Sequence, residues 1–147
     1  MSEGYVLVER SPTLEEYQRL CRAVGWEEGG IEPKALEIGL RNSLFSVCII
    51  LENKVIGCGR IIGDGGIYFY IQDIIVSPEF QRKGIGGRMM DAIMEYLKAH
   101  APEGAFIGLM AAKGVSKFYE QYGFQKRPSD APGMFRVLRK TYNFPSQ

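Results

Sequence analysis

One run of residues in this chain is well suited to binding an anion: Gln81-Arg82-Lys83-Gly84-Ile85-Gly86. It follows an apolar stretch typical of a β-strand, residues 68–76, and leads into an amphipathic stretch typical of a helix, residues 87–100. Glycine permits a tight turn and lets a ligand approach the backbone without meeting a Cβ. The first N–H groups of a helix lack acceptors within it, and the positive end of the helix dipole lies there. The run therefore predicts a site for a phosphate or pyrophosphate.

The alternative for this run is an ordinary strand-to-helix connection in which the glycines serve only the turn. Three glycines at one helix entrance cost roughly 0.5 to 1 kcal/mol each relative to alanine unless something requires them. Positive charge close by also favours an anion site, and it is supplied by Arg82, Lys83 and Arg88. We therefore expect phosphate recognition to be local to this loop.

A second group that could do chemistry lies downstream, in residues 118–124, Phe-Tyr-Glu-Gln-Tyr-Gly-Phe. Tyr119 falls on an i, i+3, i+4, i+7 stripe with Val115, Phe118 and Tyr122, which is typical of core packing. By this pattern alone Tyr119 is a structural residue. A phenol with a pKa of about 10 is also a suitable acid toward a thiolate, because it stays protonated at neutral pH.

Gln-x-x-Gly-x-Gly at 81–86 and Phe-Tyr-x-x-x-Gly-Phe at 118–124 occur in the order and at the separation seen in one protein family. Together they resemble the acetyl-CoA pyrophosphate loop and the downstream signature of the GNAT family of N-acetyltransferases. The resemblance extends over most of the chain, although its specific motifs lie between Tyr68 and Phe124. It implies an enzyme that transfers an acetyl group from acetyl-CoA to a primary amine by direct attack in a ternary complex.

The resemblance also implies how the donor would be bound. Backbone N–H groups from Arg82 to Gly87 would hold the pyrophosphate, and Lys83 and Arg88 would neutralise it or the 3′-phosphate. The pantetheine arm would lie between two splayed parallel strands and hydrogen-bond to the main chain, as an added strand does. A bulge near Asp73 would cause the splay. The implied donor-binding residues are Ile74, Ile75, Val76, Gln81, Arg82, Lys83, Gly84, Ile85, Gly86, Gly87 and Arg88.

For catalysis, the resemblance implies that Tyr119 protonates the departing thiolate and that the N–H near Val76 polarises the thioester carbonyl. Gln72 takes the place at which some polyamine-acetylating members carry a glutamate as general base. Glutamine cannot accept a proton, although it could orient a water. Asp73 is the nearest carboxylate, but strand alternation places it on the opposite face, and stabilising a turn or bulge is its alternative role. Ala111-Ala112-Lys113 replaces an asparagine that many members carry.

Acceptor recognition is expected from two segments that line the acceptor cleft in this family. The first lies between the first two expected helices and holds Trp26, Glu27 and Glu28, and the second is the last expected hairpin, which holds Met134. Acidic and aromatic side chains suit a small cationic amine, through charge and cation–π contact. A solvated acidic loop would explain the same residues.

The hydrophobic pattern predicts the elements that position these residues. Apolar runs and turn residues predict strands at 5–9, 44–51, 55–62, 68–76, 105–110, 124–127 and 134–139. Helical spacing and capping residues predict helices at 13–24, 33–41, 84–98 and 114–122. The strand-helix-strand connection through 84–98 makes its two strands parallel neighbours. The prediction is one α/β (α+β) domain over residues 1–147, with a mixed, mostly antiparallel sheet, helices on both faces and one splayed parallel pair.

Composition restricts the other classes of protein. The chain has 147 residues, of which 46% are hydrophobic, and this fits one domain. A formal net charge of +1 gives no long-range attraction for nucleic acid or an anionic membrane. No apolar run reaches the roughly 18 to 20 residues of a membrane span, and no secretion signal is recognised. Three scattered cysteines and one histidine do not indicate disulfides or a zinc site. We expect acetyl-CoA as the donor, no metal and a cytoplasmic location, with a homodimer left open.

Two other function classes fit parts of the sequence. An acyl-CoA-binding sensor or interaction module without turnover is favoured by the missing asparagine and glutamate, whereas the retained Tyr119 argues against it. A nucleotide-binding P-loop protein is excluded because no Gly-Lys-Ser/Thr follows the glycine loop.

Overall fold

The computed structural model describes residues 4–26 and 30–140. It divides into two compact units, residues 1–110 and 111–147, whose positions relative to one another are not determined. The elements of the first unit are β1 (Val6–Val8), α1 (Leu14–Ala23), α2 (Pro33–Arg41), β2 (Phe45–Leu51), β3 (Lys54–Gly63), β4 (Tyr68–Val76), the 3-10 turn η1 (Pro78–Phe80), α3 (Ile85–His100) and β5 (Phe106–Leu109). The second unit contributes α4 (Ser116–Glu120).

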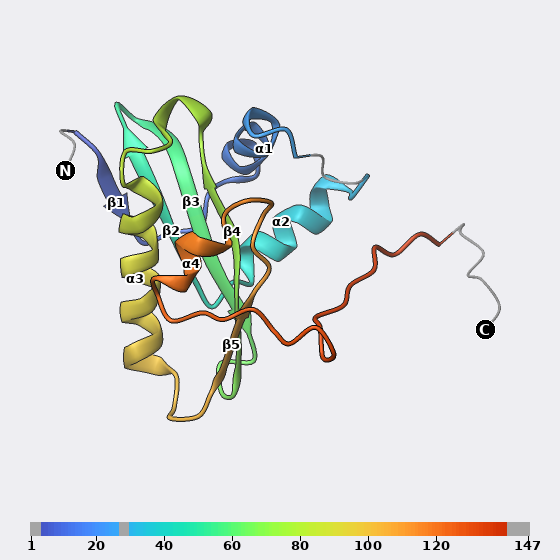
Figure 1. The fold of residues 1–147 in the computed structure, drawn as a ribbon. Helices are drawn as coiled ribbons and strands as arrows, with labels where there is room; N and C mark the ends of the chain where they lie inside the picture. The colour runs from blue at the N-terminus through green and yellow to red at the C-terminus, as the bar shows by residue number, and fades with distance from the viewer. Residues whose placement is uncertain (1–3, 27–29, 141–147) are drawn as a thin grey trace. The chain divides into compact units, whose positions relative to one another are not determined.

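Within the described residues, the five strands of the first unit form one sheet in the order β1-β2-β3-β4-β5. Strands β1 to β4 are antiparallel neighbours. Strands β4 and β5 are parallel, because α3 connects them as a crossover. Figure 1 shows α3 along one face of the sheet and α1 and α2 on the other. The predicted mixed sheet with helices on both faces is confirmed.

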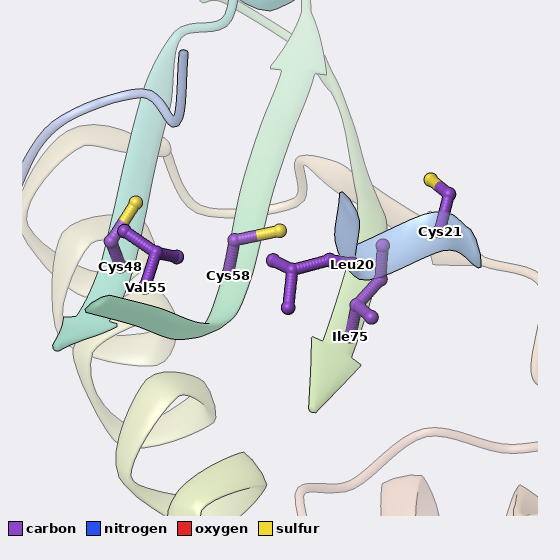
Figure 2. Close-up of a cluster of buried hydrophobic side chains, with 6 residues drawn as sticks. All are labelled: Leu20, Cys21, Cys48, Val55, Cys58 and Ile75. Carbon is purple, nitrogen blue, oxygen red and sulfur yellow. The ribbon is translucent and has the colours of Figure 1, made fainter. Parts of the chain in front are cut away.

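Each face of the sheet has its own apolar core. The core on the α1 side is built from six buried side chains: Leu20, Cys21, Cys48, Val55, Cys58 and Ile75 (Figure 2). The core on the α3 side is built from five: Val47, Ile49, Ile56, Ile85 and Met89. Consecutive strand residues thus enter opposite cores, as the pleat requires. The three cysteines form no disulfides and pack in the interior as small apolar side chains.

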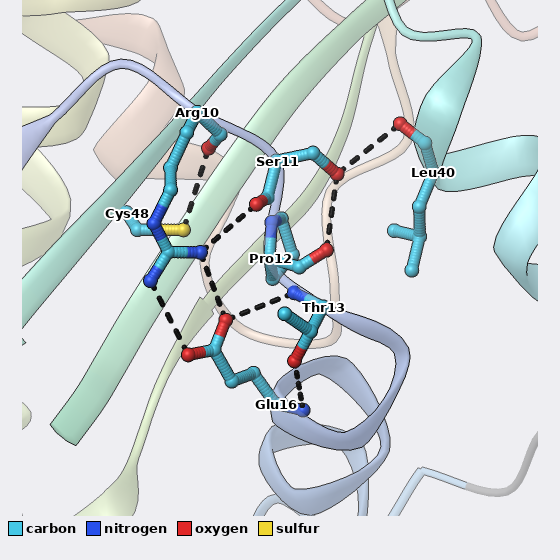
Figure 3. Close-up of polar contacts among 7 residues, drawn as sticks. All are labelled: Arg10, Ser11, Pro12, Thr13, Glu16, Leu40 and Cys48. Atoms are coloured by element: carbon cyan, nitrogen blue, oxygen red, sulfur yellow. Dashed lines mark hydrogen bonds and ion pairs between the residues drawn. The ribbon is translucent and has the colours of Figure 1, made fainter.

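The start of α1 is fixed by polar contacts that also anchor the preceding loop (Figure 3). Thr13 Oγ1 accepts the Glu16 N–H, and Glu16 Oε1 accepts the Thr13 N–H, so the two residues form a capping box. The Arg10 guanidinium donates to both Glu16 carboxylate oxygens, at 2.9 and 3.2 Å. This arginine holds the pKa of the Glu16 carboxyl below its ordinary range. Ser11 Oγ donates to the Leu40 carbonyl and links the loop to α2.

The hairpin between β2 and β3 explains how these strands keep their register. The two loop residues, Glu52 and Asn53, both have positive φ, 49° and 65°. Two consecutive residues of this kind form a type I′ turn, whose twist matches that of the flanking strands. The hairpin predicted from Glu52-Asn53-Lys54 is confirmed, with Lys54 as the first residue of β3.

The second unit differs from the prediction. Within residues 111–140, neither 124–127 nor 134–139 forms a strand, and α4 is shorter than the predicted 114–122. The predicted strands were wrong because an apolar segment forms a strand only when a neighbouring strand pairs with its backbone. The apolar side chains of residues 134–138 are exposed instead of packed; Met134 is 89% exposed and Phe135 is 77% exposed. Among the described residues, no helix is long and apolar enough to cross a membrane.

Candidate active site

The loop between η1 and α3 has the backbone geometry of an anion cup. Arg82 and Gly84 both adopt left-handed conformations, with φ of 64° and 82°, and Gly84 is the N-cap of α3. The first bond within the helix runs from the Arg88 N–H to the Gly84 carbonyl at 3.0 Å. The amides of Ile85 and Gly86 therefore lie in the first turn, at the positive end of a 16-residue helix. Successive N–H groups turned in this way form a concave site for an anion.

The side chains around this loop have different partners. Gln81 Nε2 donates to the Val76 carbonyl at 2.9 Å and so ties the loop to the end of β4. Arg88 Nη1 donates to the Tyr5 carbonyl at 3.1 Å, which directs this side chain toward the strand β1. Lys83 is exposed, with its Nζ 5.9 Å from the centre of the Phe80 ring. Lys83 is therefore better placed than Arg88 to meet a phosphate.

A β-bulge interrupts the pairing of β3 with β4. Cys58 pairs with Ile75 and Arg60 pairs with Gln72, so Asp73 and Ile74 together oppose Gly59. Asp73 has a φ of 58°, in the left-handed region. A Cβ on Gly59 would lie 2.6 Å from Ile74 Cδ1, so Ile74 fills the space that a side chain would need. The bulge that the family resemblance implied near Asp73 is confirmed.

The bulge changes which way the end of β4 faces. Ile74 and Val76 pack against the core on the α3 side, whereas Ile75 belongs to the core on the α1 side. In the part of the chain that the structure describes, the parallel pairing of β4 with β5 ends at Ile71 and Leu109. Leu109 is also the last residue of β5, so the pairing ends where β5 ends, and the implied splay stays a prediction.

On the β5 side, residues Gln72 to Val76 of β4 pair with no strand among the described residues and form an open backbone edge. The Ser77 N–H donates to the Ile56 carbonyl of β3 at 2.9 Å. Because neighbouring residues in an antiparallel strand direct their backbone groups to opposite sides, the N–H and C=O of Val76 face away from β3. The bond from Gln81 Nε2 to the Val76 carbonyl lies on this open side. The Val76 N–H thus points toward the open edge.

The side chain of Asp73 lies on the same face as that of Gln72, and the prediction of opposite faces was wrong. Gln72 Nε2 donates to Asp73 Oδ1 at 3.3 Å, and Arg60 Nε donates to Asp73 Oδ2 at 2.8 Å. Simple alternation fails here because the bulge adds one residue to β4. The Asp73 side chain is 5% exposed, and both of its oxygens have donors. This environment argues against Asp73 as a general base and favours the bulge-stabilising role.

Two residues near this face were missed in the sequence. Arg60 stands within the buried, apolar part of strand β3, and one arginine in such a strand was the available signal. Its Nη1 donates to the Gly39 carbonyl at 3.1 Å and to Ser43 Oγ at 3.2 Å. Tyr17 of α1 packs beside the core on this side. Burial, helped by the Asp73 carboxylate, raises the pKa of the Tyr17 hydroxyl.

Tyr119 lies in α4 of the second unit, in an aromatic cluster. Its ring is 5.0 Å from that of Phe118 and 6.4 Å from that of Phe124, in edge-on geometry. Gly123 follows the helix with a φ of 92°, and the Phe124 N–H donates to the Tyr119 carbonyl at 3.4 Å. Burial raises the pKa of the Tyr119 hydroxyl. The local packing of residues 118–124 is thus defined, whereas the position of Tyr119 relative to acetyl-CoA stays a prediction.

The predicted acceptor residues are only partly described. Trp26 follows α1 and is 39% exposed, with its N–H bonded to the Cys21 carbonyl at 2.8 Å. Glu27 and Glu28 lie outside the described residues. Met134 is exposed in the second unit and belongs to no hairpin. Among the described residues, no group of three or more metal-ligating side chains comes together.

Comparisons with known proteins agree with this geometry. A profile of the acetyltransferase (GNAT) domain matches residues 43–126. An uncharacterized N-acetyltransferase of Pyropia yezoensis, ycf52, is 30% identical over 135 residues, which cover 89% of this chain and 75% of that protein.

Solved structures give the same result. A Staphylococcus aureus protein described as a probable acetyltransferase has a TM-score of 0.84 and 34% identity, over 91% of this chain and 99% of that one. A GNAT-family acetyltransferase of Streptococcus pneumoniae has a TM-score of 0.74 and 29% identity, over 92% of this chain and 99% of that one. This chain belongs to the GNAT family of acetyltransferases.

Proposed function

We propose that this acetyltransferase moves the acetyl group of acetyl-CoA to the primary amine of a small cationic acceptor, by direct attack in a ternary complex. The observation that carries the proposal is the open edge of β4 beside the cup at the start of α3. An extended pantetheine arm can bond to the edge from Gln72 to Val76 as a strand would. Its pyrophosphate would then bind the amides of the loop 82–87, with Lys83 supplying charge.

The reaction needs one bond made and one broken. The amine nitrogen attacks the thioester carbonyl carbon, a C–N bond forms, and the C–S bond breaks to release the thiolate of CoA. The Val76 N–H, which faces the open edge, is the donor proposed to stabilise the negative carbonyl oxygen. Tyr119 is proposed to give its proton to the leaving thiolate. Holding the two reactants together supplies much of the rate enhancement.

The proton of the attacking amine needs a different route. Gln72 cannot accept it, and both oxygens of Asp73 are occupied by Arg60 and Gln72. We therefore assign proton removal to a water oriented by Gln72 and nearby backbone groups. The cationic acceptor is inferred from Trp26 with its acidic neighbours in the chain, and from an excess of acidic residues in the first unit. Residues 1–110 carry 15 acidic and 11 basic side chains.

The donor site is tested by Gly86→Val, which fills the space beneath the proposed pyrophosphate and should remove acetyl-CoA binding in calorimetry. Gly39→Val is the matched control, because it places the same side chain in helix α2, where no atom beyond the adjoining helix backbone lies within 4 Å of the added Cβ. The control should keep the parental affinity. A folded Gly86→Val protein with unchanged affinity would exclude this loop as the donor site.

The activity is tested by following free thiol release across polyamines, amino sugars, amino acids and peptides. Release of CoA that depends on a small cationic amine is the expected result. Tight acetyl-CoA binding without release for any acceptor would instead support the acyl-CoA-binding sensor. A preference for anionic or neutral acceptors would support the acetyltransferase activity and contradict the proposed cationic acceptor.

A further inference from the structure

We propose that Arg60 is a positioning residue that holds the bulge of β4 in the shape the acyl donor requires and links that shape to the end of α2. The inference rests on the proposed function, because it concerns the same open edge. Arg60 is not expected to touch the reacting atoms. It acts through Asp73, the residue whose left-handed conformation creates the bulge.

The guanidinium of Arg60 joins two parts of the first unit. On one side, its Nε lies 2.8 Å from Asp73 Oδ2 in the bulge. On the other side, its Nη1 donates to the Gly39 carbonyl of α2 and to Ser43 Oγ just beyond that helix. Ser43 Oγ in turn donates to the Leu40 carbonyl at 3.1 Å. One side chain therefore bridges the C-terminal turn of α2 and the bulge of β4.

Asp73 needs this partner to keep its conformation. A positive φ is unfavourable for a residue other than glycine, although aspartate tolerates it better than most. The Asp73 and Arg60 side chains are 5% and 16% exposed, so without Arg60 a carboxylate would be buried unpaired. The backbone can relieve that cost by returning Asp73 to an extended conformation. Two weaker contacts would resist this change: Gln72 Nε2 donates to Asp73 Oδ1 at 3.3 Å, and the buried Cys58 thiol donates to the Asp73 carbonyl at 3.6 Å.

Loss of the bulge would change the donor site directly. Without the extra residue, the register after Asp73 shifts by one, and every side chain and backbone group beyond it turns to the opposite side. The Val76 N–H would then face β3 instead of the open edge, and Ile74 would leave the space above Gly59. The shape of the bulge thus decides whether the pantetheine arm finds its backbone partners.

The test uses four variants of the full chain, each measured for thermal stability and for acetyl-CoA affinity by calorimetry well below its melting temperature. Arg60→Met keeps the length of the side chain and removes its polar contacts, and it should weaken donor affinity at least tenfold. Arg60→Lys keeps the charge but lacks the planar guanidinium, and its acetyl-CoA affinity should lie between those of the parent and Arg60→Met. Ser43→Ala removes one of the two contacts of Arg60 at the end of α2 and leaves the ion pair intact, so it should weaken donor affinity less than Arg60→Met does. The double variant Arg60→Met/Asp73→Gly should recover most of the affinity, because glycine adopts the left-handed conformation without a partner.

A role limited to stability would lower the melting temperature of Arg60→Met and leave the affinity of its folded protein unchanged, and that result would overturn the proposal. Failure of the double variant to recover affinity would overturn it as well. If Arg60→Met does not fold, Arg60→Lys takes its place, and parental affinity in that variant counts against the proposal. In turnover, KM for acetyl-CoA should rise more than kcat falls. A parent protein that binds no acetyl-CoA would reject the proposed function itself, before any variant is compared.

Discussion

At Asp73, a single backbone angle decides what chemistry the side chain can do. Alternation along β4 predicts that Asp73 and Gln72 point to opposite faces, yet their side chains touch at 3.3 Å. The alternating pattern could not show this, because a bulge adds a residue without changing the hydrophobic character of the strand. Only the family resemblance placed a bulge here. The loop 81–86, by contrast, was predicted from its residues alone, since glycines and basic side chains at a helix start act through local geometry.

Tyr119→Phe should lower kcat by roughly tenfold to a thousandfold, the usual range for loss of a general acid. Acetyl-CoA affinity should change little, because the ring keeps its packing against Phe118 and Phe124. Burial raises the pKa of this hydroxyl, so the acid form persists beyond pH 10 and its ionisation should not limit the rate at moderately alkaline pH. Steady-state kinetics and calorimetry on the same preparation measure both effects.

Tyr122→Phe is the matched control for that variant. Tyr122 lies in the same aromatic cluster, with its ring 5.6 Å from that of Phe118. Its variant should turn over like the parent. Equal loss of kcat in the two variants would mean that the hydroxyls support packing and that Tyr119 is not the acid, provided that chemistry limits the rate.

Among the elements, the β3–β4 pair positions the donor edge, and glycine makes its packing possible. Gly59 faces the two residues of the bulge and leaves room for Ile74. Gly57, two residues earlier, is also closely covered, since an added Cβ would lie 3.2 Å from the Ile75 carbonyl oxygen. Glycine inside a strand often marks a bulge or a close approach of another backbone. The sequence therefore held a signal for the bulge, in the glycines of Val55–Ile62, that the apolar pattern alone conceals.

Gly59→Val should destabilise the protein by about 1–3 kcal/mol, the usual cost of overfilling a packed core. The added side chain meets Ile74 at 2.6 Å and Ile93 at 3.4 Å, so one of them must move. Because Ile74 belongs to the bulge, acetyl-CoA affinity should fall together with stability. Urea unfolding and calorimetry provide the two measurements.

Gly39→Ala is the comparison, because Gly39 lies inside α2 and no atom beyond the adjoining helix backbone lies within 4 Å of an added Cβ. Alanine there should raise stability by roughly 0.5–1 kcal/mol, as expected for glycine replaced within a helix. Donor affinity should stay parental. The account of the bulge fails if Gly59→Val is as stable as the parent and binds acetyl-CoA equally well.

The last two predicted strands show the limit of pattern analysis at the level of elements. Residues 134–139 contain four apolar side chains and were predicted as a strand, yet the structure leaves these side chains exposed and the backbone outside any sheet. A pattern describes which side chains one segment could bury. It does not supply the neighbouring strand that must bond to the backbone, and this partner depends on the whole chain.

For the whole molecule, the small net charge conceals an uneven distribution. Residues 111–147 carry 7 basic and 2 acidic side chains, whereas residues 1–110 carry 11 basic and 15 acidic ones. A net charge of +1 therefore describes neither unit. The prediction that the protein does not bind nucleic acid rests on that total, and the basic second unit is the part in which salt-dependent binding should be measured.

Stability should fall as pH rises above the ordinary pKa of a thiol, because buried groups in the first unit resist ionisation. Burial raises the pKa of Cys48 to about 11, and it raises the pKa of Cys58 and of Tyr17 as well. Between the unfolded and the folded pKa, the unfolded chain has lost a proton that the folded protein keeps, so the free energy of unfolding decreases as pH rises. Each such group contributes a slope of about 1.4 kcal/mol per pH unit. Urea unfolding at pH values from neutral to about 10 measures this slope. Cys48→Ala removes one of these groups, so the slope should become smaller by the contribution of one thiol. A free energy of unfolding that stays constant up to pH 10 would show that these thiols are not buried as the core of the α1 side requires.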